Sequence, residues 1–435
     1  MTDKQHAGYD GTSRRGFLRG ACAATVGSCV TAGLAARAAV HTGASETLRI
    51  GLIGCGSRGT GAAANAMKAD EDVKLVAMAD MFDDRLQASR KRLEAAGGES
   101  FAVDDDHCFS GFDAYNGLLE CGVDVVLLAT PPHFRPAHLK AAIEAGKHVF
   151  AEKPVAVDAP GIRSVMTTCK AAREKGLSIG SGLMLRYSTA MREMMGRIHD
   201  GGIGQITALQ ANYNIGGLWL RVRQDDWSDM EWQLRNWYYF TWLSGDHNVE
   251  QHVHGLDLMS WAMQDQYPKE CFGLGGRQAR TAPQYGHIFD HHAVCYEFES
   301  GVRCFSYCRQ QSGTAADTSH LVFGQTGTAN LSKHTTTGET TWRYSRARGG
   351  PRDVPYQQEQ DALFASIRSG EPINNGEYMA KSTLMAIMGR MATYTGQVVT
   401  WDEAWNSEED LTPSAYEFGP LPVPPVAVPG VTKFC

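Results

Sequence analysis

A glycine-rich turn close to the start of the chain constrains the fold most strongly. The apolar run 48–53 leads directly into Gly54-x-Gly56-x-x-Gly59, and a second apolar run, 73–79, ends at Asp80. A G-x-G-x-x-G turn between a strand and a helix, followed by an acid about 20 residues later, marks dinucleotide-binding α/β units. We therefore predict an α/β fold whose N-terminal part is a doubly wound parallel sheet (Rossmann).

Each residue of this turn has a physical role in the prediction. Gly54 allows the tight turn, Gly56 lets backbone N–H groups approach a pyrophosphate, and Gly59 lets the next helix pack closely. That helix begins near Ser57-Arg58, so its positive N-terminal end faces the phosphates. Asp80 can accept hydrogen bonds from ribose hydroxyls and would repel a 2′-phosphate. The sequence thus favours NAD over NADP as the cofactor.

The first 40 residues are predicted to be an export signal outside the fold. Ser13-Arg14-Arg15-Gly16-Phe17-Leu18 resembles a twin-arginine signal, the Ala-rich stretch 21–36 follows, and Ala36-Arg37-Ala38 fits a cleavage site. A disordered basic tail is the alternative. We expect the protein to be periplasmic or otherwise exported through the twin-arginine pathway, which carries folded proteins.

Composition limits the partners. The 435 residues suggest two domains, and a net charge of -7 without a basic block beyond the N-terminus gives no reason to expect nucleic-acid binding. No apolar run after residue 45 is long enough to span a bilayer, so we expect no integral membrane segment in the mature chain. The eleven cysteines show no C-x-x-C spacing, which argues against a zinc knuckle or a disulfide framework.

Apolar strands alternate with amphipathic helical patterns up to residue 180, which defines a predicted Rossmann NAD-binding domain at 46–180. Strands are expected at 48–53, 73–79, 101–103 (weak), 123–129, 148–151 and 177–180. Helices are expected at 58–67, 84–95, 115–120, 136–145 and 161–175.

The pattern then changes to longer β segments, which predicts an open, mainly antiparallel sheet in a C-terminal α+β domain at 181–410. Its strands are expected at 206–213, 291–300, 302–309, 319–323 and 329–331. A helix at 249–263 is inserted, helices at 357–369 and 377–394 are expected to cover the sheet, and the Pro- and Gly-rich tail 411–435 is expected to wrap the surface.

Polar residues follow two of the parallel strands. Thr130-Pro131-Pro132-His133 comes after the strand 123–129, and Glu152-Lys153-Pro154 comes after the strand 148–151. Ligands of doubly wound sheets bind at the carboxyl ends of the strands. Lys153 is therefore expected near the reactive end of the cofactor.

Together, the glycine-rich turn, the Thr-Pro-Pro-His segment and the Ala-Gly-Lys-His-Val run that leads to Glu152-Lys153-Pro154 resemble the Gfo/Idh/MocA family of glucose–fructose oxidoreductases and inositol dehydrogenases. The resemblance covers most of residues 46–400. It implies that the domain at 181–410 holds the substrate site and the oligomer interface, and that the protein is a homodimer or homotetramer. It also implies that Lys153 polarises or protonates the substrate oxygen. The cofactor-binding set that we expect is Gly54, Gly56, Ser57, Arg58, Gly59, Asp80, Thr130, Pro131, His133, Glu152 and Lys153.

The family's second catalytic element, an acid and a histidine four residues apart, aligns with Glu250 and His254. Glu250, His254 and Asp257 would share one helix face at i, i+4 and i+7. An imidazole can take the proton from a hydroxyl, so His254 is the expected general base and Glu250 its partner. A hydrogen-bonded core histidine is the alternative for His254. Glu250 is longer than the aspartate of the family.

Further substrate contacts are expected from Arg186 and Tyr187 at the domain junction, and from Asp257. The segment Trp219–Trp242 is rich in Trp, Tyr and Arg, and it includes Trp237 and Tyr238. It is either a platform that stacks on sugars or a subunit interface. A metal site is an alternative for the group His247, Glu250, His252, His254, His291 and His292, but the resemblance implies none, and no metal is predicted.

These features predict an NAD(P)-dependent oxidoreductase that transfers hydride between a CH–OH group of a sugar or sugar derivative and a tightly bound nicotinamide. Two alternatives remain open. One is a glycoside hydrolase or lyase that uses transient oxidation, as the NAD-dependent α-N-acetylgalactosaminidases do. The other is a non-catalytic sugar-binding protein that keeps NAD as a structural element.

Overall fold

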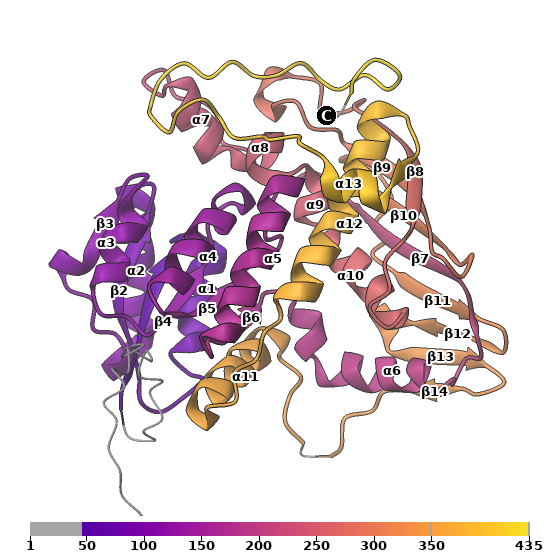
Figure 1. The fold of residues 1–435 in the computed structure, drawn as a ribbon, viewed down its shortest axis with the longest axis horizontal. Coiled ribbons are helices and arrows are strands. Elements are labelled where there is room, and N and C mark those ends of the chain that lie inside the picture. The colour runs from indigo at the N-terminus through magenta and orange to yellow at the C-terminus, as the bar shows by residue number, and fades with distance from the viewer. Residues whose placement is uncertain (1–45, 349, 434–435) are drawn as a thin grey trace, which may run out of the picture. The chain divides into compact units, whose positions relative to one another are not determined.

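The computed structural model describes residues 46–348 and 350–433, so the predicted export signal lies outside the described residues. A six-stranded, all-parallel sheet comes first (Figure 1). Its strand order is β3-β2-β1-β4-β5-β6. The strands are β1 (Leu48–Ile53), β2 (Val73–Asp80), β3 (Cys108–Ser110), β4 (Val125–Leu128), β5 (His148–Ala151) and β6 (Ile179–Ser181). The helices are α1 (Ser57–Ala66), α2 (Asp83–Gly97), α3 (Ala114–Glu120), α4 (Arg135–Glu144) and α5 (Ala159–Glu174).

Burial on both faces explains why these strands are continuously apolar. In β4, Val126 and Leu128 point into one apolar core with α4 and α5, whereas Val125 and Leu127 point into a second core with α1. Successive side chains of a strand point to opposite faces, so a strand covered on both sides needs no polar positions. This confirms the predicted doubly wound sheet.

The weak third strand was predicted wrongly at 101–103. Phe101 forms only an isolated bridge to Leu75, and the strand itself is Cys108–Ser110, paired with the end of β2. Between them, the carboxylate of Asp104 accepts a hydrogen bond from the His107 N–H and caps a short turn. A three-residue strand after an acidic turn has too little periodicity to be found in a sequence.

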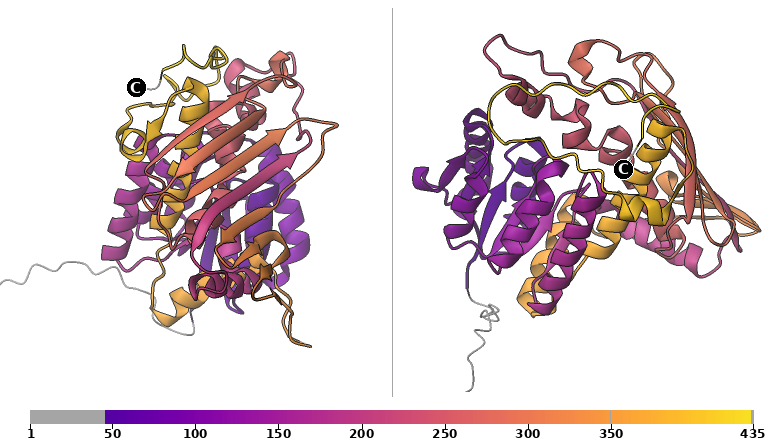
Figure 2. Two further views of the ribbon diagram at one scale, coloured as in Figure 1. Left: turned by 90° about the vertical axis from the view of Figure 1, so that its right-hand side faces the viewer. Right: turned by 45° about the horizontal axis from the view of Figure 1, so that its top comes forward.

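A second sheet of nine strands follows, in the order β14-β13-β12-β11-β7-β10-β9-β8-β15. Only β7 and β10 pair in parallel, so the sheet is mixed and mainly antiparallel, as predicted. Figure 2 shows this sheet with helices behind one face. The strands are β7 (Ile206–Ile215), β8 (Glu270–Gly276), β9 (His291–Glu297), β10 (Arg303–Gln310), β11 (His320–Gly324), β12 (Gly327–Asn330), β13 (Thr335–Gly338), β14 (Trp342–Arg343) and β15 (Val399–Thr400).

The C-terminal half also contains helices α6 (Thr189–His199), α7 (Asp229–Arg235), α8 (Thr241–Ser244), α9 (His247–Glu250), α10 (Val253–Ala262), α11 (Pro355–Ser369), α12 (Gly376–Thr395) and α13 (Trp401–Asn406). Helix α12 covers β8 and β9 and also packs against α5. Helix α11 does not cover the second sheet as expected. Its Leu363, Phe364 and Ile367 belong to the apolar core of the first sheet, beside α1.

The single helix expected at 249–263 is two helices. Helix α9 ends at Glu250, and α10 starts at Val253, after a turn at Gln251–His252. Glu250 therefore does not share a continuous helix with His254 and Asp257, which corrects the expected common face. In residues 411–433 the chain has neither helix nor strand. Among the described residues, no helix is both long and apolar enough to cross a bilayer.

Candidate active site

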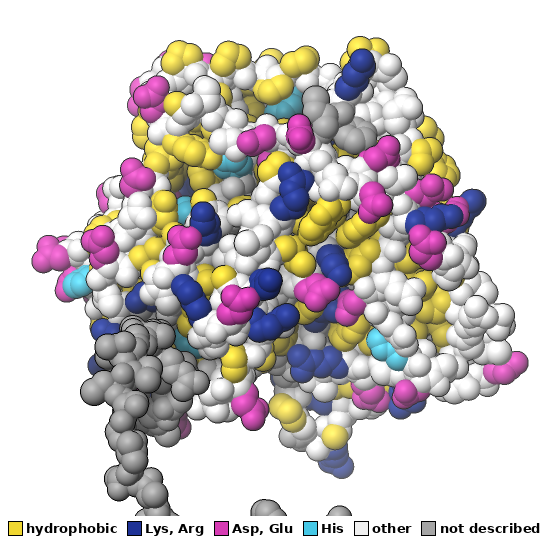
Figure 3. Space-filling model, in the orientation of Figure 1, with side chains coloured by type: hydrophobic (Ala, Val, Ile, Leu, Met, Phe, Trp, Pro, Cys, Tyr) yellow, Lys and Arg dark blue, Asp and Glu magenta, His cyan; other side chains and the backbone are white. Residues whose placement is uncertain are grey.

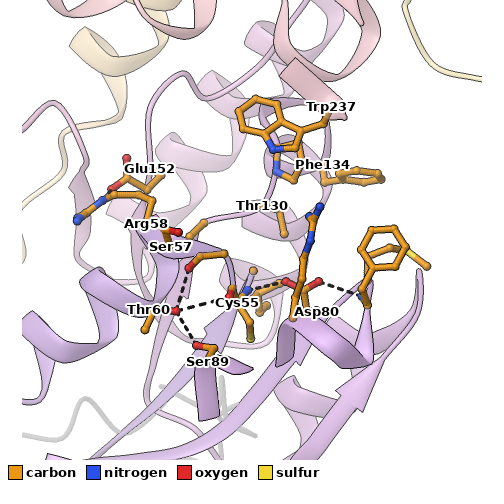
Figure 4. Close-up of a pocket in the computed structure, with 18 of the residues that line it drawn as sticks. Cys55, Ser57, Arg58, Thr60, Asp80, Ser89, Thr130, Phe134, Glu152 and Trp237 are labelled. Atoms are coloured by element: carbon orange, nitrogen blue, oxygen red, sulfur yellow. Dashed lines mark hydrogen bonds and ion pairs between the residues drawn. The ribbon is translucent and has the colours of Figure 1, made fainter. Parts of the chain in front are cut away.

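One pocket of about 800 Å³ lies at the carboxyl ends of the first sheet's strands. It is lined by the glycine-rich turn and by residues that follow β2, β4 and β5, several of which Figure 4 labels. The segment 219–237 and His254 of α10 also line it. Pockets of a few hundred to 1,000 Å³ are typical of cofactor and substrate sites. Because the pocket lies at the carboxyl ends of the strands, it is also in the place where doubly wound sheets bind ligands.

The glycine-rich turn has the shape that a dinucleotide needs. Gly54 has φ +100, and a Cβ there would lie 2.6 Å from the Thr130 nitrogen. A Cβ on Gly59 would lie 1.8 Å from the Gly54 oxygen, whereas a Cβ on Gly56 would meet nothing within 4 Å. Gly54 and Gly59 thus serve the turn and the close packing of α1. Gly56 leaves the space where a pyrophosphate could approach the backbone.

Asp80 fixes this turn to the end of β2. Its Oδ2 accepts a hydrogen bond from the Cys55 N–H at 2.6 Å, and its Oδ1 accepts one from the Phe82 N–H at 2.9 Å (Figure 4). Asp80 is only 8% exposed, and burial raises the pKa of its carboxyl group. Each carboxylate oxygen keeps acceptor capacity for a ribose hydroxyl.

Lys153 and Glu250 meet across the two halves of the chain. The Lys153 Nζ donates to Glu250 Oε1 at 3.0 Å and to the Glu250 main-chain oxygen at 2.6 Å. The peptide bond that follows, Lys153–Pro154, is cis. Because two acceptors on α9 hold the ammonium group, its position in the pocket is fixed.

His254 lines the same pocket as Lys153. Desolvation lowers the pKa of its imidazole well below the ordinary value, and the charge of Lys153 lowers it further. Its Nδ1 is buried and has no hydrogen-bond partner among the residues that the structure describes. The imidazole is therefore neutral near pH 7, which is the form that can accept a proton.

Arg58 and Glu152 form an ion pair beside the glycine-rich turn. The Arg58 Nη2 also bonds to Glu359 Oε1 at 2.9 Å, and its guanidinium stacks 4.3 Å from the ring centre of Tyr356. Glu359 and Tyr356 come from α11, and nothing in the sequence indicated their role. An acid 300 residues away carries no local pattern that could identify it.

Six of the expected site residues do not line the pocket: Gly59, whose role is the close packing of α1, and His133, Arg186, Tyr187, Tyr238 and Asp257. Arg186 forms ion pairs with Asp257 at 2.8 Å and with Asp265 at 2.6 Å, so these charges neutralise one another within the protein. The Tyr187 hydroxyl donates to Asn375. For these residues the expected contact with substrate is not supported by the geometry.

His133 and Tyr238 are likewise turned away. The His133 Nε2 lies 2.7 Å from the Tyr416 hydroxyl, and the Tyr238 hydroxyl bonds to Gln251 and Gln310. The neighbours Phe134, Arg135 and His138 line the pocket instead of His133. They belong to the same turn and first helical residues, so the sequence located the segment but not the side chains.

The aromatic segment 219–242 is mainly core. Trp232, Tyr239 and Trp242 are buried in an apolar cluster that also contains Phe82. Their burial in this cluster explains these three rings without a sugar platform or a subunit interface. Trp219 and Trp237 do line the pocket and remain available for a ligand.

The histidine-rich region brings together one buried group that could hold a metal ion, Asp246 with His247 and His292, whose ligand atoms lie within 4.8 Å of one another. The two imidazoles lower the pKa of Asp246, and the Tyr394 hydroxyl donates to its Oδ2 at 2.6 Å. His252, His254, His291 and Glu250 are not part of this group. The absence of a metal cofactor stays a prediction.

Buried histidines make stability depend on pH. Burial lowers the pKa of His320 from 6.5 to about 4. Between these values the unfolded chain binds a proton that the folded chain does not, so this contribution to stability is lost as the pH falls. Replacement His320→Gln is expected to reduce the slope of unfolding free energy against pH by about 1.4 kcal/mol per pH unit between pH 6 and 4.5. Urea unfolding at several pH values measures the slope, and an unchanged slope would contradict the expectation.

Comparisons with known proteins agree with the dinucleotide-binding fold of the first sheet. Residues 48–181 match the profile of GFO_IDH_MocA, described as "Oxidoreductase family, NAD-binding Rossmann fold". Inositol 2-dehydrogenase 3 of Saccharopolyspora erythraea is 28% identical over 292 residues, which cover 67% of this chain and 75% of that protein. The 2,7-anhydro-N-acetylneuraminate hydratase of Escherichia coli is 26% identical over 41% of this chain and 44% of its own length, so the chain spans less than half of that relative.

Solved structures share the fold. Scyllo-inositol dehydrogenase from Lactobacillus casei, solved with NAD(H) and scyllo-inositol, covers 82% of this chain with a TM-score of 0.61 and 18% identity, over all of its own chain. Aldose–aldose oxidoreductase from Caulobacter crescentus covers 82% of this chain and all of its own, with a TM-score of 0.63 and 18% identity. Residues 48–181 are therefore similar to the NAD-binding Rossmann fold of the Gfo/Idh/MocA oxidoreductase family.

Proposed function

We propose that this protein is an NAD-dependent oxidoreductase that acts on a CH–OH group of a sugar, cyclitol or related polyol. The observation that carries the proposal is the placement of Lys153 and His254 in the pocket that also contains the glycine-rich turn. A fixed ammonium and a neutral imidazole can together bind one hydroxyl group. The name of the relative from Saccharopolyspora erythraea, an inositol 2-dehydrogenase, supports the substrate class.

Lys153 and His254 have different roles in the proposed reaction. Lys153, held by Glu250, donates a hydrogen bond to the reacting oxygen and stabilises the negative charge that develops on it. His254 takes the hydroxyl proton as the substrate carbon loses hydride and becomes a carbonyl. Bound NAD supplies the hydride acceptor. In the reverse direction His254 returns the proton to the oxygen.

Asp80 is proposed to select NAD. Its buried carboxylate would lie beside a 2′-phosphate and repel it. Two cations that would attract a phosphate, Arg85 and Arg92 of α2, also line the pocket. Replacement Asp80→Ser is expected to raise the NADP-to-NAD affinity ratio at least about tenfold, since a like charge is removed next to two cations. Titration with both dinucleotides measures this, and the Asp106→Ser variant, at an exposed position outside the pocket, is the control. An unchanged ratio would contradict the role of Asp80.

Three further proposals concern the whole protein. Residues 1–40 direct export through the twin-arginine pathway, the nicotinamide stays tightly bound outside the cytoplasm, and the open sheet forms a homodimer or homotetramer. No interaction with nucleic acid is proposed. Figure 3 shows acidic and basic side chains interspersed on one face, without a continuous basic patch there.

A screen for reduced cofactor tests the proposed reaction. The purified mature protein is mixed with pools of cyclitols, aldoses, amino sugars and uronic acids, and near-ultraviolet absorbance follows NADH. We expect a rise equal to the bound NAD that reverses when a second carbonyl substrate is added. A protein that contains NAD but gives no rise with any pool would contradict it.

A second candidate, net hydration or glycoside cleavage through transient oxidation, is favoured by the relative named a hydratase. In that case NADH would not accumulate. The same pools, analysed for released aglycone or hydrated product, distinguish this candidate from the first.

A further inference from the structure

The C-terminal tail crosses from one half of the chain to the other and is fastened at Leu411 and again at Gly419 and Leu421. The Leu411 N–H donates to Asp158 at 3.1 Å, at the start of α5. Further along, the Met230 N–H of α7 donates to the Gly419 oxygen at 3.2 Å, and the Gln233 amide donates to the Leu421 oxygen at 2.7 Å. Figure 1 shows the tail in yellow as an extended segment near α7 and α8.

Between these fastenings, two aromatic rings of the tail pack on the outer side of the pocket. Phe418 stacks on Phe82 with ring centres 6.2 Å apart and contacts Phe112 at 5.7 Å. Tyr416 contacts Phe112 at 5.7 Å and Phe134 at 5.9 Å. Phe82, Phe112 and Phe134 all line the pocket, so they form an aromatic wall with the tail behind it.

This wall stands at the Asp80 end of the pocket. Phe82 lies two residues after Asp80, Phe112 lies two residues after β3, and Phe134 lies in the turn after β4. Asp80 is the residue positioned for the adenine ribose, so the wall borders the adenosine half of a bound dinucleotide. Lys153 and His254, from other elements, mark the reactive half.

Helix α7 supplies a second fastening of the same wall. The Arg235 guanidinium lies 3.9 Å from the ring centre of Phe82 and forms an ion pair with Asp84 at 3.1 Å. The Arg235 main-chain oxygen accepts from Arg85 at 3.1 Å. Because the tail bonds to α7 at Met230 and Gln233, the tail and α7 form one cover over the adenosine end.

We propose that the tail is a strap that retains the cofactor, with Tyr416 and Phe418 as positioning residues. They hold the aromatic wall in place, so the adenosine half can leave only when the strap lifts. Tyr416 is 44% exposed and Phe418 is 52% exposed, so the strap is a single layer that can open without disrupting the core. The proposal rests on the proposed function in one respect, because it requires that the pocket binds a dinucleotide.

The test measures NADH release from the full-length mature chain. Wild type and the Tyr416→Ala/Phe418→Ala variant are loaded with NADH and chased with excess NAD, and the loss of NADH fluorescence gives the release rate. We expect the variant to release NADH about 10-fold faster or more, because several ring contacts are lost together. The melting temperature without nucleotide is expected to stay within about 2 °C of wild type, since both rings lie at the surface.

Two controls separate retention from a general effect on the tail. The Val423→Ala/Val426→Ala variant removes exposed apolar side chains farther along the tail, and Tyr416→Phe keeps the ring but loses the bond to His133. Both are expected to release NADH within about twofold of wild type.

Two results would overturn the strap. A double variant that releases NADH within about twofold of wild type overturns the strap alone, whereas a wild-type protein that binds no dinucleotide overturns the proposed function and the strap together.

Discussion

The replacement Lys153→Ala is expected to lower kcat about a thousandfold while dinucleotide affinity changes less than about threefold. The ammonium group stabilises charge that develops on the substrate oxygen, and removal of one such donor typically costs 10²–10³ in rate. Glu250 fixes the group through two hydrogen bonds, so the position is specific to the reaction. Steady-state rates with a substrate from the pools, together with NADH titration, measure both quantities.

The matched control is Lys140→Ala, because Lys140 is a solvent-exposed lysine on α4. It should behave as wild type. If Lys153→Ala loses dinucleotide binding and activity together, Lys153 supports the structure and the assigned role is wrong.

The second large effect is expected for His254→Asn, with kcat about 10²–10⁴ lower. Asparagine keeps a polar group of similar size but cannot accept and return the proton. The desolvated site lowers the pKa of His254 well below its ordinary value, so the neutral base persists at mildly acid pH. Wild-type kcat/KM for oxidation should therefore be level down to below pH 6 and fall only at lower pH, when His254 becomes protonated.

A pH profile of kcat/KM tests this assignment, with His107→Asn, a histidine outside the pocket, as the control. A full-activity His254→Asn variant would return His254 to the alternative of a core histidine. A wild-type profile that falls through pH 6.5 would show that another group is the base.

The first sheet was predictable because its signals are local. Continuous apolar strands such as β4 and β5, the glycine-rich turn and Asp80 are encoded within short windows, and the structure confirms their arrangement. The break between α9 and α10 was not predictable in this way. Both sides of the Gln251–His252 turn have helical periodicity, and the turn itself lies among hydrogen bonds and packing from distant segments.

The sequence could not show which distant helices and side chains contact one another. The apolar face of α11 was visible in its periodicity, but its packing against α1 was not. Arg186 and Asp257 looked available for substrate, and only the structure shows that they neutralise each other. The tail gave no periodic signal because its contacts are isolated rings, Tyr416 and Phe418, on a chain without regular structure.

Transfer of deuterium from a labelled substrate to the nicotinamide is the most direct measurement of the proposed chemistry. A substrate identified in the pools is labelled at its reacting carbon, mixed with the NAD-containing protein, and quenched after one turnover for mass spectrometry. One deuterium per oxidised substrate should appear in the reduced dinucleotide, and this transfer should be lost in Lys153→Ala and His254→Asn. Deuterium found in water, or product formed without labelled dinucleotide, would contradict hydride transfer at this site.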